Sequence, residues 1–393
     1  MAQTQALIDA GVRFRLPRPL HPMAWWVWAI GAAAVVSTGS NPLFIVAVLA
    51  AVTLVVLARR GDNPWAGSFK VYVYLGLFVV VMRVAYRVIF GGGDGPTILF
   101  RLPYIPLPYW VGGIRLLGPV SLEALLAGLY DGLRLAGIIV CLGAANALAN
   151  PKRLLASLPG AFYEIGTVMV VAIGVFPQLG DSVTRVMRAR KLRPQPTDGR
   201  RFRRYRVVRT IIIPVLSDAL DRCLLLAASM DARGYGRAGG TSRTRRGLTT
   251  TLILGALILL GVGSYGLLSS RPLVTKWQEA VIGWPMIGAG IAAAVVGLWS
   301  AGAQVQRTTY RPDRWRVAEV VTVASSLAAW LVVRSVSNGE DAGVLYPTIN
   351  PFEWPTLILP LGIALVLVAL PALATPPPRL TTTRGAGAES GVS

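Results

Sequence analysis

Charged residues, histidine and cysteine are scarce in this sequence. Only 15% of the 393 residues are charged, and the chain has one histidine and two cysteines. His21 has no acidic or cysteine residue beside it, and Cys141 and Cys223 lack the spacing of metal ligands. Two cysteines are also too few for a disulfide framework. The sequence therefore predicts no metal site, and it indicates that both cysteines are small buried hydrophobic side chains.

A nucleotide-binding loop is missing as well. The sequence has no G-x-x-x-x-G-K-[ST] motif, in which backbone amides and a lysine cradle phosphates. The glycine-rich run at 91–95 lacks the lysine and is expected to be a flexible loop. The chain is therefore not expected to hydrolyse ATP itself, and no cofactor is predicted for it.

Apolar side chains, by contrast, are abundant. Hydrophobic residues make up 54% of the chain, and its mean hydropathy is +0.57. A soluble domain of ordinary surface is less apolar than this, so a lipid bilayer is the expected surrounding. The formal net charge of +21 would also suit nucleic acid, but the basic residues here punctuate long apolar stretches. They form no soluble reading element, so no nucleic-acid partner is expected.

Eight apolar stretches are long enough for membrane-spanning helices, which need about 20 residues. Tryptophans gather near their ends, as is typical of the membrane interface. The predicted fold class is an all-α polytopic membrane protein with about eight transmembrane helices. The predicted spans are 23–38, 41–58, 70–90, 121–146, 248–268, 281–301, 317–336 and 354–375.

The distribution of positive charge predicts the orientation of these spans. If the N-terminus is cytoplasmic, most of the 39 lysine and arginine residues fall on the cytoplasmic side. Cytoplasmic loops of membrane proteins carry such an excess. We therefore expect a multi-pass protein of the cell (inner or plasma) membrane with both termini in the cytoplasm.

Two apolar segments do not fit a regular span. Prolines and glycines interrupt the segment 97–117, so it is predicted to form a short external β-like hairpin with arms 97–102 and 114–117. The segment 161–177 is short, and a full crossing there would break the even count of spans. We interpret it as re-entrant or interfacial.

These segments define the predicted organisation of the chain. The spans that follow residue 270 are expected to pack beside the core formed by the first four. The predicted parts are a cytoplasmic tail at 1–22, four spans with the hairpin at 23–146, a cytoplasmic or interfacial coupling region at 147–247, C-terminal spans at 248–375 and a disordered tail at 376–393.

The coupling region keeps a helical period although it is rich in charge. From Gln178 onward an amphipathic helix is predicted, with Val186 and Met187 on its apolar face. Arg190 lies on the continuation of that face, just before Pro194 ends the helix. Its guanidinium is expected to project where the packed face stops.

A second amphipathic helix is predicted from Pro214 to about Gly234. Asp218 and Arg222 stand four residues apart, so they are expected to form a structural ion pair on this helix. The glycines from Gly234 onward are natural helix stops. The predicted apolar stripe comprises Leu216, Leu220, Cys223, Ala227 and Met230.

Each of these two helices ends in an alanine followed by an arginine. The pairs are Ala189-Arg190, followed by Lys191, and Ala232-Arg233, followed by Gly234. A small neighbour allows close approach of another protein, and a guanidinium can bind a carboxylate through two hydrogen bonds. Docking onto two acidic grooves is one interpretation. Binding of anionic lipid headgroups explains any single arginine equally well.

The order of these parts resembles the EcfT/CbiQ family, the transmembrane (T) components of energy-coupling factor (ECF) ABC transporters. The resemblance covers about residues 20–270 and rests on the first spans, the proline-broken hairpin, PKRLLASLP at 151–159, DSVTRVMRARKLRP at 181–194 and SDALDRCLLLAASMDARGYG at 217–236. In that family two Ala-Arg-Gly signatures dock into two ATP-binding subunits. The residues at 232–234 match the signature fully, whereas Lys191 replaces the glycine of the first.

The resemblance implies a non-catalytic subunit of an ATP-driven importer. Its partners would be two ABC ATP-binding subunits, which bind ATP and magnesium, and a small hydrophobic substrate-binding S component. The docking residues would be those at 189–191 and 232–234, with Asp218, Arg222, Val186, Met187 and Met230 supporting the coupling helices. The substrate would be a vitamin or a metal ion.

Two readings from other classes are open. A membrane-embedded lipid-diphosphate transferase would use paired carboxylates to hold magnesium, and Asp218 with Asp221 is the one available pair in the coupling region. A stand-alone secondary transporter would place charged or broken helices near the bilayer midplane. Few charges lie within the predicted spans, and several of them are near span ends.

Overall fold

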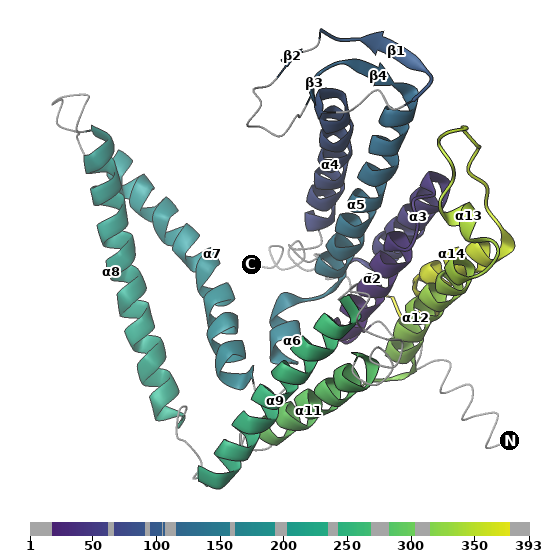
Figure 1. The fold of residues 1–393 in the computed structure, drawn as a ribbon. Coiled ribbons are helices and arrows are strands. Elements are labelled where there is room, and N and C mark those ends of the chain that lie inside the picture. Colours follow the sequence, from purple (N-terminus) through teal and green to yellow (C-terminus); the bar gives the residue numbers. More distant parts are fainter. Residues whose placement is uncertain are drawn as a thin grey trace, which may run out of the picture. The chain divides into compact units, whose positions relative to one another are not determined.

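The computed structural model describes most of the chain and divides it into two compact units. The described residues are 18–61, 67–90, 95–103, 105–106, 115–157, 162–192, 203–234, 243–268, 283–302 and 315–377. One unit comprises Met1–Leu154 with Asp313–Ser393, and the other comprises Leu155–Pro312. Both consist almost entirely of helices (Figure 1).

The first unit joins helices from both ends of the chain. From the N-terminal part it takes α2 (Pro22–Ser37), α3 (Pro42–Arg59), α4 (Ser68–Phe90) and α5 (Leu122–Leu148). The boundary between the units falls within the short α6 (Pro151–Ala156), after Leu154. From the C-terminal part it takes α12 (Val317–Asn338), α13 (Ala342–Leu345), α14 (Leu359–Ala369) and α15 (Pro371–Ala374). The second unit contains α7 (Tyr163–Lys191), α8 (Arg203–Ala232), α9 (Arg243–Leu268) and α11 (Trp284–Gly302).

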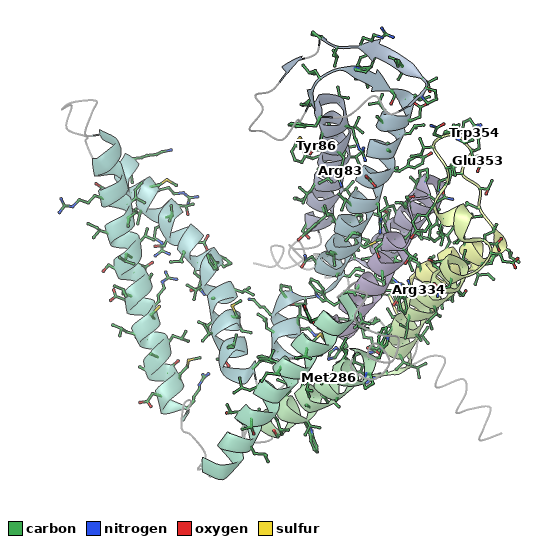
Figure 2. The ribbon with its side chains drawn as sticks, in the orientation of Figure 1. Arg83, Tyr86, Met286, Arg334, Glu353 and Trp354 are labelled. Carbon is green, nitrogen blue, oxygen red and sulfur yellow. The ribbon has the colours of Figure 1, made fainter. Side chains whose placement is uncertain are left out.

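The prediction of an all-α polytopic membrane protein is confirmed, although the set of spans differs in detail. Seven described helices are long and apolar enough to cross a membrane. The predicted spans 23–38 and 354–375 correspond to shorter apolar helices, because α2 has 16 residues and α14 begins only at Leu359. Glu353 and Trp354 lie in the loop before α14 (Figure 2). A helix at Ile165–Ala189, not predicted as a span, qualifies instead.

Polar caps define where α2 and α3 begin. The Nδ1 atom of His21 accepts a hydrogen bond from the Met23 amide at 3.3 Å, and Oδ1 of Asn41 accepts one from the Phe44 amide at 3.1 Å. A proline follows each cap, and its fixed φ suits the first helical position. The Asn41 side-chain amide also donates to the carbonyl oxygens of Val344 and Thr356, both at 2.9 Å. The start of α3 is therefore tied to the C-terminal part of the chain.

The C-terminal helices α12 and α14 contribute to the central core of the first unit. Trp28 on α2 is fully buried, and its indole N–H donates to the carbonyl of Val368 on α14 at 3.2 Å. Val333 on α12 and Leu361 on α14 are fully buried in the same hydrophobic cluster. The expectation that the spans after residue 270 pack beside the core of the first four is therefore confirmed for α12 and α14, which also contribute buried side chains to that core. These helices cover apolar faces of α2 and α3 that would otherwise be exposed.

Glycines allow α4 and α5 to approach closely. A Cβ atom at Gly132 would lie 3.0 Å from the Cα of Val80, and one at Gly143 would lie 2.4 Å from the Tyr72 side chain. As the contact on α5 moves toward its C-terminus, the contact on α4 moves toward its N-terminus, so the helices are antiparallel. Small residues are typical of such close packing between membrane helices.

The predicted β-like hairpin is present, with a different pairing of its arms. Strand β1 (Ile98–Arg101) pairs antiparallel with β4 (Pro119–Ser121), and β2 (Ile105–Pro106) pairs with β3 (Arg115–Leu116). The predicted second arm at 114–117 therefore faces the inner strand β2, and the hairpin extends to Ser121. Residues 107–114 of its tip lie outside the described part. The Ser121 hydroxyl then accepts from the Ala124 amide and caps α5.

In the second unit α9 and α11 form a glycine-packed antiparallel pair. A Cβ at Gly290 would lie 3.0 Å from the Leu260 backbone nitrogen, and one at Gly263 would lie 2.7 Å from the Ile287 side chain. These glycines allow the two helix backbones to approach more closely than larger side chains would permit.

Candidate coupling site

The first predicted coupling helix is part of a longer one. Helix α7 runs without a break from Tyr163 to Lys191 and contains Pro177 in its interior. The segment 161–177, interpreted above as re-entrant or interfacial, is not separated from residues 178–191 by a break. Its described part, from residue 162 on, leads into and forms the first half of α7. The mean hydropathy of the Ile165–Ala189 window is 1.4, so it is apolar enough to cross a membrane. Its charged residues begin only at Asp181.

The second coupling helix is also longer than predicted. Helix α8 begins at Arg203, 11 residues before Pro214, and ends at Ala232. Pro214 lacks a backbone N–H and removes one hydrogen bond, but the helix continues through it. Its predicted end near Gly234 is confirmed.

A group of four polar side chains joins α7 to α8. The Ser182 hydroxyl donates to the Asp218 carboxylate at 2.7 Å, and the Arg222 guanidinium donates to the Gln178 side-chain oxygen at 3.2 Å. Arg222 also forms the predicted ion pair with Asp218 at 3.1 Å. We call Gln178, Ser182, Asp218 and Arg222 the polar clasp.

The polar clasp shows that the two helices are antiparallel. Moving four residues back along α7, from Ser182 to Gln178, corresponds to moving four residues forward along α8, from Asp218 to Arg222. Both contacts therefore lie on one face of each helix, one turn apart. They fix the register of the pair.

Hydrogen bonding changes the acidity of the clasp. The Ser182 hydroxyl, followed by Arg222, lowers the pKa of Asp218 below its ordinary value of 3.8, because both stabilise the ionised carboxylate. The side chain is about one-third exposed, so solvent screens part of this effect. Asp218 is therefore ionised at neutral pH and is already engaged by neighbours within the chain.

The register places the two Ala-Arg pairs at opposite ends of the helix pair. Arg190 lies eight residues beyond Ser182 on α7, and Arg233 lies 15 residues beyond Asp218 in the opposite direction. At a rise of 1.5 Å per residue, these 23 residues correspond to about 34 Å along the pair. The two arginines therefore cannot serve one small anionic site together.

The end of α8 presents Arg233 to the surroundings. The Arg233 and Gly234 amides donate to the carbonyls of Met230 and Asp231, and Gly234 has a φ of 77°. This left-handed conformation favours glycine and turns the chain away from the helix. Ala232 and Arg233 are exposed, and within the described residues no carboxylate forms an ion pair with Arg233.

The end of α7 differs from that of α8. Ala189 and Lys191 are exposed and lie in the last turn of the helix, which continues to Lys191 without a glycine stop. Arg190 belongs to the same turn, but its side chain is outside the described part. Positive charge at a helix C-terminus complements the helix dipole.

The predicted apolar stripe of α8 is largely uncovered in the single chain. Leu216 and Leu220 are more than half exposed, and Cys223 is exposed too, so the prediction that both cysteines are buried holds only for Cys141. Met230 and Val186 are half-buried, whereas Met187 is exposed. The face that α8 turns toward α7 is rotated away from the stripe and carries Asp218 and Arg222.

Sequence reasoning missed Ser182 and Gln178. Neither has a partner within four residues along the chain, so nothing in the local pattern connects either one to α8. Their spacing of one helical turn matches that of Asp218 and Arg222. That match is the only signal in the sequence, and it becomes informative only once the two helices are known to pair.

These features define a class of protein. It is an all-α, multi-pass membrane protein that carries a charged antiparallel helix pair with an arginine near the C-terminal end of each helix. Within the described residues, no group of three or more His, Cys, Asp or Glu side chains is placed to hold a metal ion.

Comparison with known proteins identifies the family. The CbiQ family model, described as cobalt transport protein, matches residues 13–244, which is more than half of the chain. The chain therefore belongs to the CbiQ family. Its curated relatives are transmembrane components of energy-coupling factor transporters, as the resemblance implied.

Three relatives illustrate the extent of the similarity. The chain is 26% identical over 234 residues to the energy-coupling factor transporter transmembrane protein EcfT of Streptococcus thermophilus, covering 58% of this chain and 85% of that protein. It is 27% identical to EcfT 1 of Listeria monocytogenes, covering 52% and 74%. It is 26% identical to EcfT of Thermotoga maritima, covering 63% and 89%. The chain is thus the energy-coupling transmembrane component of an ECF transporter.

Proposed function

We propose that this T component couples two ABC ATP-binding subunits to a small hydrophobic S component for uptake of a vitamin or a metal ion. The observation that carries the proposal is the position of Arg190 and Arg233 at opposite ends of one helix pair, about 34 Å apart along it. Two separate docking points of this kind suit two partner subunits. ATP and magnesium are bound by those partners.

Each docking contact uses an arginine at an open helix end. Arg233 is exposed and follows the small Ala232, so a carboxylate groove on a partner can approach its guanidinium closely. A guanidinium that binds a carboxylate through two hydrogen bonds transmits both position and direction. We assign the same role to Arg190, with Lys191 in place of the glycine that follows Arg233.

The S component is expected to cover the exposed apolar stripe of α8. Leu216 and Leu220 are more than half exposed although they lie on a strongly charged helix. Uncovered apolar surface of this kind typically marks an interaction site. Movement of the ATP-binding subunits would then be passed through α7 and α8 to the S component.

The membrane placement is part of the proposal. We place both termini and the charged halves of α7 and α8 in the cytoplasm, because positive charge concentrates there. The apolar half of α7, before Asp181, would lie in or against the membrane. The transferase alternative has little support, since Asp218 is engaged by Ser182 and Arg222 and the chain belongs to a transporter family.

Co-purification from the native host tests this proposal. Tagged chain extracted in mild detergent should bring down two ABC ATP-binding subunits, or two copies of one, and a small hydrophobic protein, identified by mass spectrometry. A variant with both Arg190 and Arg233 replaced by alanine should lose the ATP-binding subunits while remaining in the membrane. Wild-type chain that purifies without any ATP-binding subunit would contradict the proposal.

A further inference from the structure

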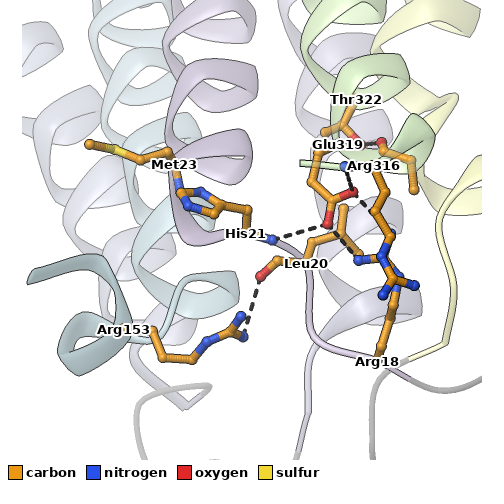
Figure 3. A network of polar contacts seen from close by, with 9 residues as sticks. Arg18, Leu20, His21, Met23, Arg153, Arg316, Glu319 and Thr322 are labelled. Carbon is orange, nitrogen blue, oxygen red and sulfur yellow. Dashed lines mark hydrogen bonds and ion pairs between the residues drawn. The ribbon is translucent and has the colours of Figure 1, made fainter. Parts of the chain in front are cut away.

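Glu319 is a buried carboxylate at the start of α12, in the part of the chain that the family model does not match. Only 1% of its side chain is exposed. Its two oxygens accept hydrogen bonds from both terminal nitrogens of Arg18, at 2.7 and 2.9 Å, and from the backbone N–H groups of Arg316 and His21, at 3.1 and 3.4 Å (Figure 3).

Four donors make this carboxylate a strong anchor. A buried charge is stable only when it is paired and its lone pairs are satisfied. Arg18 supplies the opposite charge through two hydrogen bonds. These bonds fix the orientation of the Glu319 carboxylate as well as its distance from the guanidinium. The Arg316 amide belongs to the same helix start, so Glu319 joins the beginning of α12 to the segment at 18–21 that precedes α2.

A further contact extends the network to α6. The Leu20 carbonyl accepts a hydrogen bond from the Arg153 guanidinium of α6 at 3.4 Å, and Leu20 itself is buried (Figure 3). Asn150 caps α6 through the Lys152 amide at 2.9 Å. The three segments, α12, 18–21 and α6, all have these contacts within the first unit.

The network reaches α6, which directly precedes the coupling helix α7 in the chain. Helix α6 ends at Ala156, and α7, which carries Ser182 and Arg190, begins at Tyr163. The boundary between the two units falls within α6, after Leu154, so the chain passes from the first unit to the coupling helices through this element. Arg18, Leu20 and Arg153 lie in the region matched by the family model. Glu319 lies in residues 245–393, outside that match, which we call the C-terminal extension.

We propose that Glu319 is a positioning residue that fixes α6, through Arg18 and the segment at 18–21, as the stationary base of the coupling helices. This inference rests on the proposed function, because it assigns the C-terminal extension a part in the same machinery. When ATP-binding subunits move α7 and α8, a fixed α6 directs the movement into those helices. Without Glu319, part of the movement is lost in displacement of α6.

Spin labels on α6 and α12 test the proposal directly. Cysteines replace the exposed Lys152 and Arg334 in a chain carrying Cys223→Ser, because Cys223 is exposed and would also be labelled. Arg334 lies 15 residues beyond Glu319, about 22 Å along α12, which gives a separation suited to pulsed electron resonance. The probes are measured in the full chain alone and in its co-purified complex, with and without Mg-ATP.

The expected result is a single narrow distance distribution in the otherwise wild-type chain, unchanged by Mg-ATP. Glu319→Gln should broaden it at least twofold, and Mg-ATP should shift it further in the complex. The control Glu340→Gln, at an exposed position of the same extension, should leave it narrow. Reversing the pair, with Arg18→Glu and Glu319→Arg together, should restore only part of the narrow component, because an arginine side chain cannot accept the hydrogen bonds from the Arg316 and His21 backbone N–H groups.

Two outcomes would overturn the proposal. One is a distribution in Glu319→Gln as narrow as in the control, and the other is equal broadening in both variants. If Glu319→Gln does not accumulate in the membrane, Arg18→Gln removes the same pair from the other side and must give the broadening. Absence of ATP-binding subunits from the wild-type complex would count against the proposed function alone, since the distances in the isolated chain still decide the role of Glu319.

Discussion

The Ser182 hydroxyl on α7 donates a 2.7 Å hydrogen bond to the Asp218 carboxylate on α8. This contact joins residues 36 positions apart and, together with the bond between Arg222 and Gln178, sets the antiparallel register of the two coupling helices. The register in turn determines that Arg190 and Arg233 lie at opposite ends of the pair. A small polar contact thus sets the spacing of the two arginines that we propose as docking points.

Removing the carboxylate should loosen this pair. Asp218→Asn loses the charge that Arg222 pairs with and weakens the bond from Ser182. In a chain carrying Cys223→Ser, disulfide crosslinking between cysteines introduced at Val183 and Val215 should therefore become slower and less specific. Asp221→Asn, an exposed aspartate on the same helix, is the matched control and should leave crosslinking unchanged. Equal crosslinking in both variants would show that the polar clasp does not hold the helices.

The same contact predicts a direction of pH dependence. The pKa of Asp218 is lower in the folded chain than its ordinary value of 3.8, so its ionised form stabilises the pair. That stabilisation is complete above the ordinary pKa and is lost as the pH falls below it, through the lowered pKa. The ratio of crosslinking in the parent chain to that in Asp218→Asn should therefore be constant from neutral pH to about pH 5 and fall toward one below pH 4. The ratio is the readout, because disulfide formation needs a thiolate and slows equally in both chains as the pH falls.

Gly234 should be needed to end α8. Its φ of 77° costs other residues about 1–2 kcal/mol, so Gly234→Ala should strain the helix end or lengthen it and misdirect Arg233. Co-purification of ATP-binding subunits should weaken several-fold. Gly180→Ala on α7 is the control, since a Cβ there meets no atom within 4 Å and needs no unusual φ. Retained binding in Gly234→Ala would argue against a role for this helix end.

The C-terminal helices should be required for the stability of the first unit. Leu361 is fully buried on α14, so Leu361→Ala leaves a cavity that costs about 2–5 kcal/mol by analogy with other buried leucines. Leu359→Ala removes the same atoms from an exposed position of the same helix and should have little effect. Thermal unfolding in detergent distinguishes the two. A similar Tm for both would mean that α14 only lies beside the core.

Local patterns in the sequence predicted the fold class and several local features of the candidate site. The pair Asp218 and Arg222, the helix end at Gly234 and most of the spans follow from spacing within one element. Continuity through Pro177 and Pro214 was not predictable, because proline usually ends or kinks a helix and only the packing shows otherwise. The exposure of Cys223 depends on which face of α8 meets α7, and the bond between Arg18 and Glu319 joins residues 301 positions apart. Neither the exposure of Cys223 nor the bond between Arg18 and Glu319 produces a local pattern in the sequence.

The most direct test of the account is the amount of ATP-binding subunit that co-purifies with Arg233→Ala compared with Arg209→Ala. Both arginines are exposed and belong to the α8 region, but only Arg233 lies at the helix end after a small residue. Loss of a partner to a carboxylate in an interface can cost about 2–5 kcal/mol. We expect at least a tenfold loss for Arg233→Ala, partial recovery for Arg233→Lys and no loss for Arg209→Ala. Equal retention in Arg233→Ala and Arg209→Ala, with lysine a full substitute at 233, would contradict it and favour simple attraction to lipid headgroups.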